Sequence, residues 1–246
     1  MTSRLVDVRA RKDKILGITI DQYIKTVSPV SSMFLATEYN LELSPASIRN
    51  ILAELEEDGY LTHPHTSAGR IPTQMGYRYY VDHLMDEIQL LEEEKQRIKA
   101  EVDQNSMELE ELLDKTSRVL SDTTHYTSII SVDGWGNKVF CCGTSFIVDY
   151  PEYQDIKKIG NILTALDEKE QLLGIINQDL AKKINIYIGH EMACSEINSC
   201  SLVVSRYRSK EGTTGRLAVL GPTRMNYEHV VSAIDYLSHH LMEEIL

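Results

Sequence analysis

"SPASIRNILAELEEDG" (Ser44–Gly59), followed at once by "YLTHPHTSAGRIP" (Tyr60–Pro72), decides the fold of the N-terminal part of this chain. The serine before Pro45 is typical of a helix start, since serine caps free backbone amides and proline fits the first turn. A glycine ends the run, and a stripe of apolar residues at helical spacing lies before it: Ile48, Ile51, Leu52, Leu55. The second stretch holds two short extended pieces around a turn-rich centre, which predicts a β-hairpin directly after the helix.

Two further helices are expected upstream of this one. The first covers residues 8–26 and ends in "TVSPVSS", because the residue before Pro29 avoids helical geometry. The second is short and capped by Ser31 or Ser32. Its inward candidates are Phe34, Leu35 and Tyr39. Two helices joined by a tight turn are typical of a helix-turn-helix, whose second helix lies in the DNA major groove.

The outward face of the helix after Pro45 carries the candidates for reading bases. With the apolar stripe inward, these residues fall on or beside that face near the helix start: Ala46, Ser47, Arg49, Asn50. Arginine and asparagine make bidentate contacts to guanine and adenine. The acidic run "ELEED" lies further along and is expected to point away from DNA. The alternative is that Arg49 merely solvates a helix face.

The hairpin is expected to act as a wing beside this helix. Gly69 is expected to take the conformation that a tight tip demands, and Arg70 at the tip is a candidate for a minor-groove or phosphate contact. Thr66 and Ser67 are candidates to donate hydrogen bonds to phosphate. The histidines His63 and His65 leave half a metal site as an alternative, but no third ligand lies near them in sequence.

"PTQMGYRYYVDHLM" restarts a helix, with Thr73 as its cap. Its tyrosines are expected to pack inward: Tyr77, Tyr79, Tyr80. Arg78 is left as a further candidate for a phosphate contact.

Composition and charge bound the classes of protein. The 246 residues, 42% of them hydrophobic, suffice for one large domain or two ordinary ones. The formal net charge is −12, yet residues 1–80 hold equal numbers of basic and acidic side chains, so the first part can still present a basic face to phosphate. No stretch is apolar enough for a membrane helix or a signal peptide, which predicts a cytoplasmic protein without membrane contact.

Residues 84–119 follow a heptad pattern and are the sequence's candidate for dimerisation. The apolar members of the seam are Leu84, Ile88, Leu91, Ile98, Val102, Leu109 and Leu112. The alternative is a pair of amphipathic helices that pack on their own domain and break near Asp103 to Asn105, where a capping box is expected. In either form the segment is expected to link the domains.

The remainder of the chain is predicted to form a sheet with helices, an α+β domain. Strands are expected in "YTSIISVD", "KVFCCGTSFIVD", "INIYIGHE", "SCSLVVSRY" and "GRLAVLG". Arg224 is expected to tie the last helix to the sheet. The cysteines suit reduced core thiols without disulfides or zinc: Cys141, Cys142, Cys194, Cys200. The sequence lacks a phosphate loop, a nucleophile elbow and a catalytic carboxylate-histidine cluster, so we expect no enzyme, no metal and no cofactor.

Three blocks of the sequence carry a family resemblance. "SPASIRNILAELEEDGYLTHPHTSAGRIPTQMGYRYYVDHLM" resembles the DNA-binding region of the HrcA-type heat-inducible transcription repressors. "CSLVVSRY" with "LAVLGPTRMNYEHVVSAIDYLSHHL" is similar to that family's C-terminal stretch, and "IVDYPEYQDIKKIGNILTALDEKEQLLGII" to the segment before it. The resemblance implies a winged helix-turn-helix domain over 1–82, a helical linker over 83–121 and a GAF-like α+β domain over 122–246.

The resemblance also implies a function. It indicates a homodimeric repressor of class I heat-shock operons, bound to double-stranded DNA at an inverted-repeat operator of CIRCE type and kept active by a GroEL-type chaperonin. The residues expected to contact DNA are Ser44, Ala46, Ser47, Arg49, Asn50, His65, Thr66, Ser67, Gly69, Arg70 and Arg78. Two alternatives stay open: a winged-helix regulator controlled by a small effector on its GAF-like domain, and an interaction module without operator binding.

The chain departs from the family pattern in ways that bear on DNA and assembly. Ile51 stands where an aspartate is usual, Ser31 replaces a glycine, and Ser47 replaces a threonine. The family's members are usually much longer and carry an inserted dimerisation domain, which this sequence is expected to lack.

Overall fold

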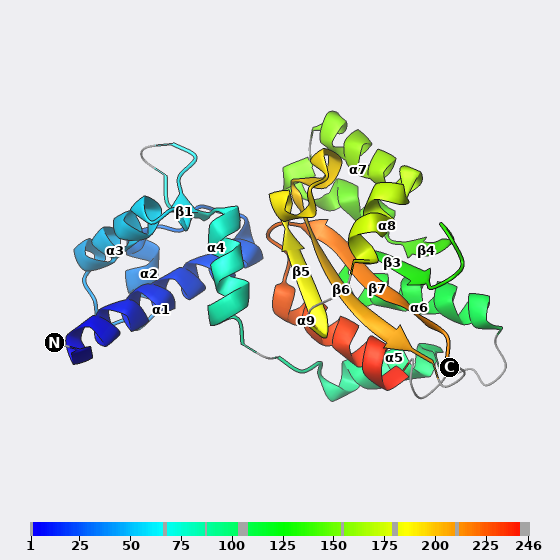
Figure 1. Ribbon diagram of the computed structural model, residues 1–246. Helices are drawn as coiled ribbons and strands as arrows, with labels where there is room; N and C mark the ends of the chain where they lie inside the picture. The colour runs from blue at the N-terminus through cyan, green and yellow to red at the C-terminus, as the bar shows by residue number, and fades with distance from the viewer. Residues whose placement is uncertain are drawn as a thin grey trace. The chain divides into compact units, whose positions relative to one another are not determined.

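The structure is a computed structural model that describes residues 2–65, 68–86, 88–102, 108–153, 155–178, 182–209 and 212–241. It divides into two compact units, Met1–Asp86 and Glu87–Leu246 (Figure 1). The mixture of helices and sheet confirms the α+β class. The division falls after Asp86 rather than at residue 82, and the helices expected as a separate linker lie in the second unit. Within the described ranges, no helix is both long and apolar enough to cross a membrane.

The first unit contains helices and a hairpin in the predicted order. Its elements are α1 (Thr2–Thr26), α2 (Ser32–Glu38), α3 (Pro45–Glu57), β1 (Leu61–Thr62), β2 (Ile71–Pro72), α4 (Gln74–Tyr79) and a π-helical turn (Tyr80–Leu84). The expected caps are present: the side chains of Ser31, Ser44 and Thr73 each accept a hydrogen bond from a backbone amide in the following turn. Helix capping of this kind is why the sequence located these starts well.

One face of each helix supplies the core of the first unit. The buried side chains include Ile15, Leu16, Ile20, Val30, Leu35, Ile48, Leu52, Leu55, Leu61, Tyr77 and Tyr80. The predicted stripe of α3 is therefore confirmed, except that Ile51 is only half-buried. Two tyrosine hydroxyls fasten α4 and the π-helical turn to α1: Tyr79 donates to Asp13 at 2.9 Å and Tyr80 to Asp21 at 2.6 Å. Burial raises the pKa of Asp21.

The hairpin is anchored at its base to the segment before α2. β1 and β2 pair antiparallel over two residues each, and Arg70 forms a further antiparallel bridge with Val30 through two backbone hydrogen bonds of 2.8 and 2.9 Å. The expectation that Gly69 shapes the tip of the hairpin is wrong, since it lies beside the Arg70–Val30 bridge at the base and its φ is not positive. Its absent side chain matters instead because a Cβ would lie 2.6 Å from the Val30 carbonyl oxygen. Gly69 therefore permits the close approach of two backbones.

The second unit is built on a five-stranded antiparallel sheet of order β4-β3-β7-β6-β5. The strands are β3 (Thr127–Val132), β4 (Val139–Cys142), β5 (Ile184–Ile188), β6 (Cys200–Arg208) and β7 (Thr214–Pro222). The predicted strand over "KVFCCGTSFIVD" ends early, because Gly143 takes a positive φ and the chain turns into a 3-10 segment, Thr144–Asp149. Shorter 3-10 turns occupy Pro151–Tyr153, Gly189–Met192 and Ser195–Ile197.

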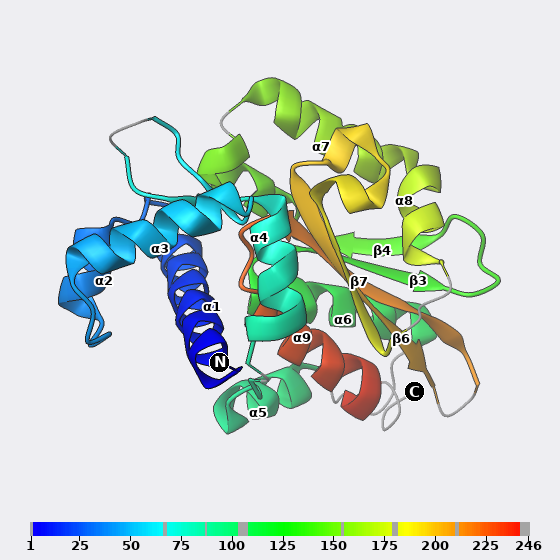
Figure 2. The same cartoon turned by 60° about the vertical axis from the view of Figure 1, so that its left-hand side comes forward.

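Helices cover both faces of this sheet (Figure 2). On one face lie α6 (Leu109–Thr124) and α9 (Tyr227–Asp235), with α5 (Glu92–Val102) packed on α6 and a π-helical turn (Tyr236–Leu241) after α9. On the other face lie α7 (Ile156–Glu168) and α8 (Glu170–Ile176), which break at Lys169 where the backbone takes a positive φ.

The two faces differ chemically, because alternate residues of a strand point to opposite sides. The face under α7 and α8 is apolar and includes Ile129, Leu202, Val204, Ala218 and Leu220. The face under α6 and α9 uses buried hydroxyl pairs: Ser117 with Ser128 at 2.8 Å, Ser201 with Tyr227 at 2.8 Å, and Ser205 with Ser238 at 3.1 Å. Each hydroxyl is satisfied by another, as burial requires.

The cysteines occupy two environments. Cys194 and Cys200 are buried, as expected of core thiols, and burial raises the pKa of both, that of Cys200 to about 11. Cys141 and Cys142 lie instead on the edge strand β4, where Cys141 is exposed, so the expectation of a core position fails there. All four thiols are free.

The replacement Gly69→Ala tests the close approach at the hairpin base. A methyl group must push the Val30 carbonyl away, so we expect a loss of about 1–3 kcal/mol in the free energy of unfolding, measured by urea denaturation. Gly17→Ala in α1 is the matched control in the same unit, because a Cβ there meets only a side-chain carbon at 3.9 Å. Equal stabilities of the two variants would contradict the role of Gly69.

Candidate nucleic-acid interface

The N-terminal half of α3 presents its polar side chains to solvent. Ala46, Arg49 and Asn50 are exposed, whereas Ile48 between them is fully buried. Behind them, the cap Ser44 accepts from the backbone of Ser47, and the two hydroxyls lie 2.9 Å apart. The helix start is thus held by its own side chains, and Arg49 and Asn50 project from a rigid element.

The C-terminal half of α3 carries acidic residues that are engaged by cations of the same unit. Lys12 of α1 pairs with Glu54 at 2.8 Å and with Asp58 at 3.3 Å. These contacts raise the pKa of Lys12, mainly through its hydrogen bond to Glu54. Because carboxylates near a helix C-terminus oppose the helix dipole, the lysine offsets an unfavourable local charge. The pairing with Lys12 was not predicted from the sequence, and the expectation that this acidic run points away from DNA stays a prediction.

Glu56 gathers two residues of the hairpin. Its carboxylate pairs with Arg70 Nη2 at 2.7 Å and contacts Nδ1 of His63. The predicted position of Arg70 at the wing tip is therefore wrong: the residue lies at the base, bridged to Val30 through its backbone and to α3 through its side chain. His63 is likewise occupied by Glu56, and no group of three His, Cys, Asp or Glu side chains placed to hold a metal occurs among the described residues.

A hollow of about 350 Å³ opens between α3, the segment before α2 and the hairpin base. It is lined by Val30, Ser31, Ser32, Arg49, Leu52, Ala68, Gly69 and Arg70. The Nε of Arg70 is buried and has no hydrogen-bond partner within the part of the chain that the structure describes. The hollow thus brings together two guanidinium groups and two serines that are far apart in sequence.

The other residues predicted to contact DNA are placed as follows. His65 is exposed in the loop of the hairpin, and Arg78 on α4 pairs with Asp82 at 3.4 Å, one turn along the chain. Thr66 and Ser67 lie outside the described residues. The structure therefore brings Arg49 together with the hairpin base, leaves Asn50 exposed beside it on α3, and places Arg78 in an ion pair within its own helical segment.

The predicted dimerisation seam is divided between core and surface. Ile98, Val102 and Leu112 are buried inside their own unit, so they cannot also contact a second chain in this conformation. Leu84 and Leu109 are half-buried, while Ile88 and Leu91 are 50% and 69% exposed. Two separate helices, α5 and α6, replace a continuous coiled coil, as the alternative expected; Asn105 and its predicted capping box fall outside the described residues.

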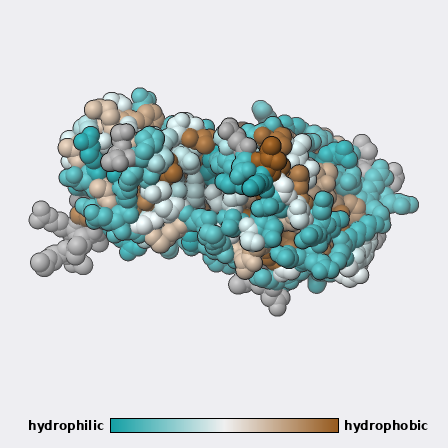
Figure 3. All heavy atoms as spheres, turned by 90° about the horizontal axis from the view of Figure 1, so that it is seen from above, coloured by the Kyte–Doolittle hydropathy of each residue, from teal (hydrophilic) through white to brown (hydrophobic). Residues whose placement is uncertain are grey.

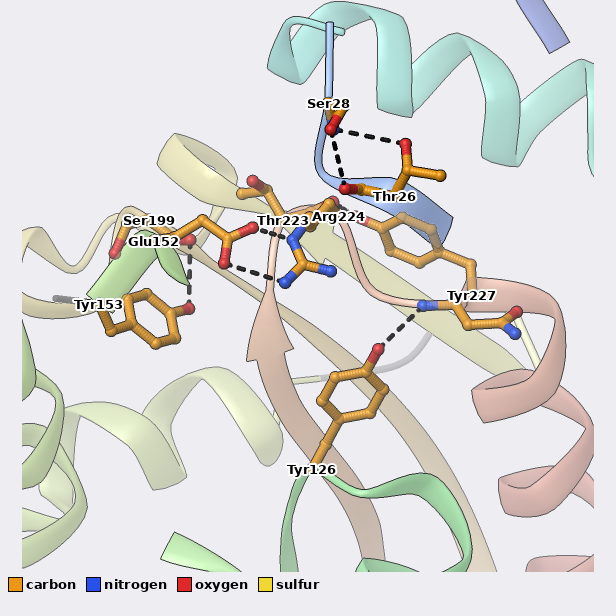
Figure 4. A network of polar contacts seen from close by, with 10 residues as sticks. Thr26, Ser28, Tyr126, Glu152, Tyr153, Ser199, Thr223, Arg224 and Tyr227 are labelled. Atoms are coloured by element: carbon orange, nitrogen blue, oxygen red, sulfur yellow. Dashed lines mark hydrogen bonds and ion pairs between the residues drawn. The ribbon is translucent and has the colours of Figure 1, made fainter. Parts of the chain in front are cut away.

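Arg224 lies in the turn after β7 and binds the 3-10 turn Pro151–Tyr153. Its guanidinium pairs with Glu152, with Nη2 at 3.1 Å from Oε2 (Figure 4). The guanidinium also lies over the ring of Tyr150. On the same turn Tyr227 donates to the Thr223 carbonyl, and Tyr126 accepts from the Asn226 amide. Arg224 was expected to hold the last helix to the sheet. Its guanidinium instead binds Glu152 in residues 151–153, so it has a structural partner.

Comparison with known proteins confirms the resemblance found in the sequence. Residues 131–231 match the family model described as the HrcA protein C terminal domain. A protein of Symbiobacterium thermophilum named heat-inducible transcription repressor HrcA is 29% identical, over 95% of this chain and 97% of its own length. The protein of that name from Carboxydothermus hydrogenoformans is also 29% identical, over 96% and 97%.

The alignments also bear on length, and a solved structure bears on the fold. The alignment to the Symbiobacterium protein runs over 332 positions, so at least 86 of them have no counterpart in this chain of 246 residues. A crystal structure described as that of a hypothetical protein has a TM-score of 0.77 at 18% identity, covering 94% of this chain and 97% of that one. This likeness supports the fold alone.

The replacement Glu56→Gln tests whether this carboxylate holds the hairpin to α3. Loss of its charge leaves Arg70 partly buried without its counter-ion, so we expect a destabilisation of about 1 kcal/mol in urea unfolding, and faster amide exchange in the hairpin. Glu57→Gln, at the exposed neighbouring position, makes the same chemical change as a control. The role of Glu56 is refuted if both variants match the wild type.

Proposed function

Proceeding from this confirmed resemblance to the HrcA repressors, we propose that the chain is a sequence-specific DNA-binding transcriptional repressor that acts as a dimer on an inverted-repeat operator. The first unit is then a winged helix-turn-helix domain, with α3 as recognition helix and β1–β2 as the base of the wing. The second unit is its GAF-like regulatory domain. The relatives are named as repressors, which is not the name of an enzyme.

The observation that carries this proposal is the exposure of Arg49 and Asn50 at the start of α3, beside a hairpin fixed to the same helix. Recognition helices read bases through residues near their N-terminus, and these two side-chain types pair bidentately with guanine and adenine. The fixed hairpin supports a second contact at a constant distance from the first.

Local charge favours this face of α3 despite the net charge of −12. Three of the four carboxylates in the acidic run contact cations of the unit: Glu54 and Asp58 share Lys12, and Glu56 binds Arg70. Glu57 is exposed. The two cations weaken, without cancelling, the repulsion that reaches the DNA backbone, because opposite charges in contact offset one another at a distance.

The hollow at the hairpin base is our candidate position for a backbone phosphate. Arg49 supplies positive charge on its wall, whereas the charge of Arg70 is offset by Glu56 and its buried Nε is a donor without a partner among the described residues. Phosphate contacts of this kind fix the register of a protein on the duplex without reading sequence. Arg70 thus keeps its proposed part in DNA binding, from the base of the wing instead of its tip.

The family resemblance extends the proposal to regulation. The operator is then of CIRCE type, the controlled genes are chaperone operons, and a GroEL-type chaperonin keeps the repressor active. When heat fills the chaperonin with unfolded protein, the repressor loses its partner by mass action and operator occupancy falls.

The rival mechanism, a small effector held by the second unit, has two candidate positions. One is a hollow of about 290 Å³ beside α9, lined by Lys95, Ser232 and Asp235 among others. The other is the hollow between the sheet and its outer helices. That hollow, lined by Ile129, Val139 and Leu172 among others, has a volume of about 10 Å³. A volume of this size holds roughly one water molecule. The other alternative, an interaction module without operator binding, predicts that the chain does not bind DNA, so a DNA-binding measurement distinguishes it from the repressor.

A salt-titrated gel shift with an inverted-repeat duplex and a scrambled duplex tests the proposal. Arg49→Ala should lose about 1–3 kcal/mol of discrimination between the two, because a bidentate base contact is removed. Arg70→Ala should weaken binding to both duplexes. The slope of log affinity against log salt concentration should fall by about one, because one phosphate contact is lost.

Arg118→Ala is the control for charge, since this exposed side chain belongs to α6 of the other unit. It should bind like the wild type. Equal affinity of the wild-type chain for both duplexes would rule out a sequence-specific repressor, and wild-type behaviour of Arg49→Ala would rule out α3 as the reading element.

A further inference from the structure

The beginning of α3 presents three side chains to solvent. Within residues 45–50, Ala46, Arg49 and Asn50 are exposed, and Ile48 is fully buried. Positions separated by three and four residues share one side of a helix, so the three exposed side chains form one outward face. The face of the first unit drawn at the left of Figure 3 mixes hydrophilic and apolar residues. Arg49 and Asn50 are candidates for reading bases, and Ala46 lies beside them without a polar group of its own.

The methyl group of Ala46 is available for contact with another molecule. Because the residue is exposed, its side chain does not belong to the core of the first unit. A methyl group neither donates nor accepts a hydrogen bond, so it recognises a ligand only through apolar contact and fit. Its neighbour Ser47 is half-buried, and the Ser47 hydroxyl lies 2.9 Å from that of Ser44. Ala46 therefore gives the outward face a small apolar group at the start of the helix.

The position of this methyl group is fixed by the helix start. Pro45 restricts the backbone directly before Ala46, and the Ser44 side chain accepts a hydrogen bond of 3.1 Å from the Ser47 amide. The location of a Cβ atom follows from the backbone alone, since alanine has no side-chain rotamers. A contact through Ala46 therefore requires no ordering of a flexible side chain.

We propose that Ala46 makes the chain specific for thymine, by packing its methyl group against the C5-methyl group of that base in the major groove. This inference rests on the proposed function, because it takes α3 as the recognition helix. Thymine presents an apolar methyl group on its major-groove edge, and alanine is a side chain suited to contact it. Arg49 and Asn50 read neighbouring bases through hydrogen bonds, so the outward face of α3 distinguishes bases by two kinds of chemistry.

Helix geometry also predicts where this thymine lies. Ala46 precedes Arg49 by three residues, which is about 4.5 Å along the helix axis. Successive base pairs are about 3.4 Å apart along the duplex. With α3 lying along the groove, the thymine is therefore one or two base-pair steps from the base that Arg49 reads.

Replacement of thymine by deoxyuridine tests the proposal, because the two nucleotides pair alike and differ at the C5-methyl group. The full chain is titrated in gel shifts with the inverted-repeat duplex and with copies that carry deoxyuridine at one thymine position of each half-site. At one position the wild type should bind about fourfold more weakly for each half-site, as loss of one buried methyl contact requires. Ala46→Gly should bind the intact duplex more weakly and be insensitive to deoxyuridine at that position.

Ala53→Gly is the matched control on the same helix. Ala53 is half-buried two turns further along, beside the exposed Glu54, and glycine weakens a helix at either position. This variant should keep the wild-type sensitivity to deoxyuridine, which separates a lost methyl contact from a weakened helix. Thermal unfolding of both variants reports the helix effect directly.

The outcomes distinguish this inference from the proposed function. A wild-type chain that binds the inverted repeat no better than scrambled DNA rules out both. Specific binding without sensitivity to deoxyuridine at any position, sensitivity that Ala46→Gly retains, or sensitivity that Ala53→Gly also loses overturns the role of Ala46 alone. A sensitive thymine more than two base-pair steps from the base pair at which Arg49→Ala loses discrimination overturns it as well.

Discussion

The close approach of Gly69 to the backbone of Val30 is the constraint on which the first unit depends. Two strands of two residues each cannot hold a hairpin in water by their own hydrogen bonds. The bridge between Val30 and Arg70 supplies the missing pairing, and Glu56 fixes the Arg70 side chain to α3. The hairpin, the segment before α2 and α3 are therefore joined to one another by backbone and side-chain contacts.

The two halves of α3 carry side chains of different charge. The first half carries Arg49 and Asn50 toward solvent, and the second half carries carboxylates that bind Lys12, Arg70 and His63. The acidic residues thus join α1, α3 and the hairpin, while the opposite end of the helix stays available. The net charge of the whole chain does not show this division, because it counts each carboxylate without regard to the cation beside it.

The sequence predicts what depends on local chemistry and fails where distant segments meet. Caps at Ser44 and Thr73 and the apolar stripe of α3 follow from the helix period and from free amides, so they were predictable. The place of Arg70 depends on Val30 and Glu56, which no local pattern connects to it. The heptad seam failed for another reason: a period of 3.5 residues differs little from 3.6 over short helices, so Ile98 and Val102 fit a coiled coil or a domain core equally well.

The burial of Cys194 and Cys200 affects how readily these thiols react with oxidants. A thiol reacts with oxidants as its thiolate, and with a pKa of about 11 the thiolate of Cys200 is on the order of one in ten thousand at neutral pH. Cys194 is shifted in the same direction by burial. Burial and a raised pKa thus both disfavour oxidation of these two side chains. The core beneath α7 and α8 keeps its packing under conditions that would modify an accessible, acidic cysteine.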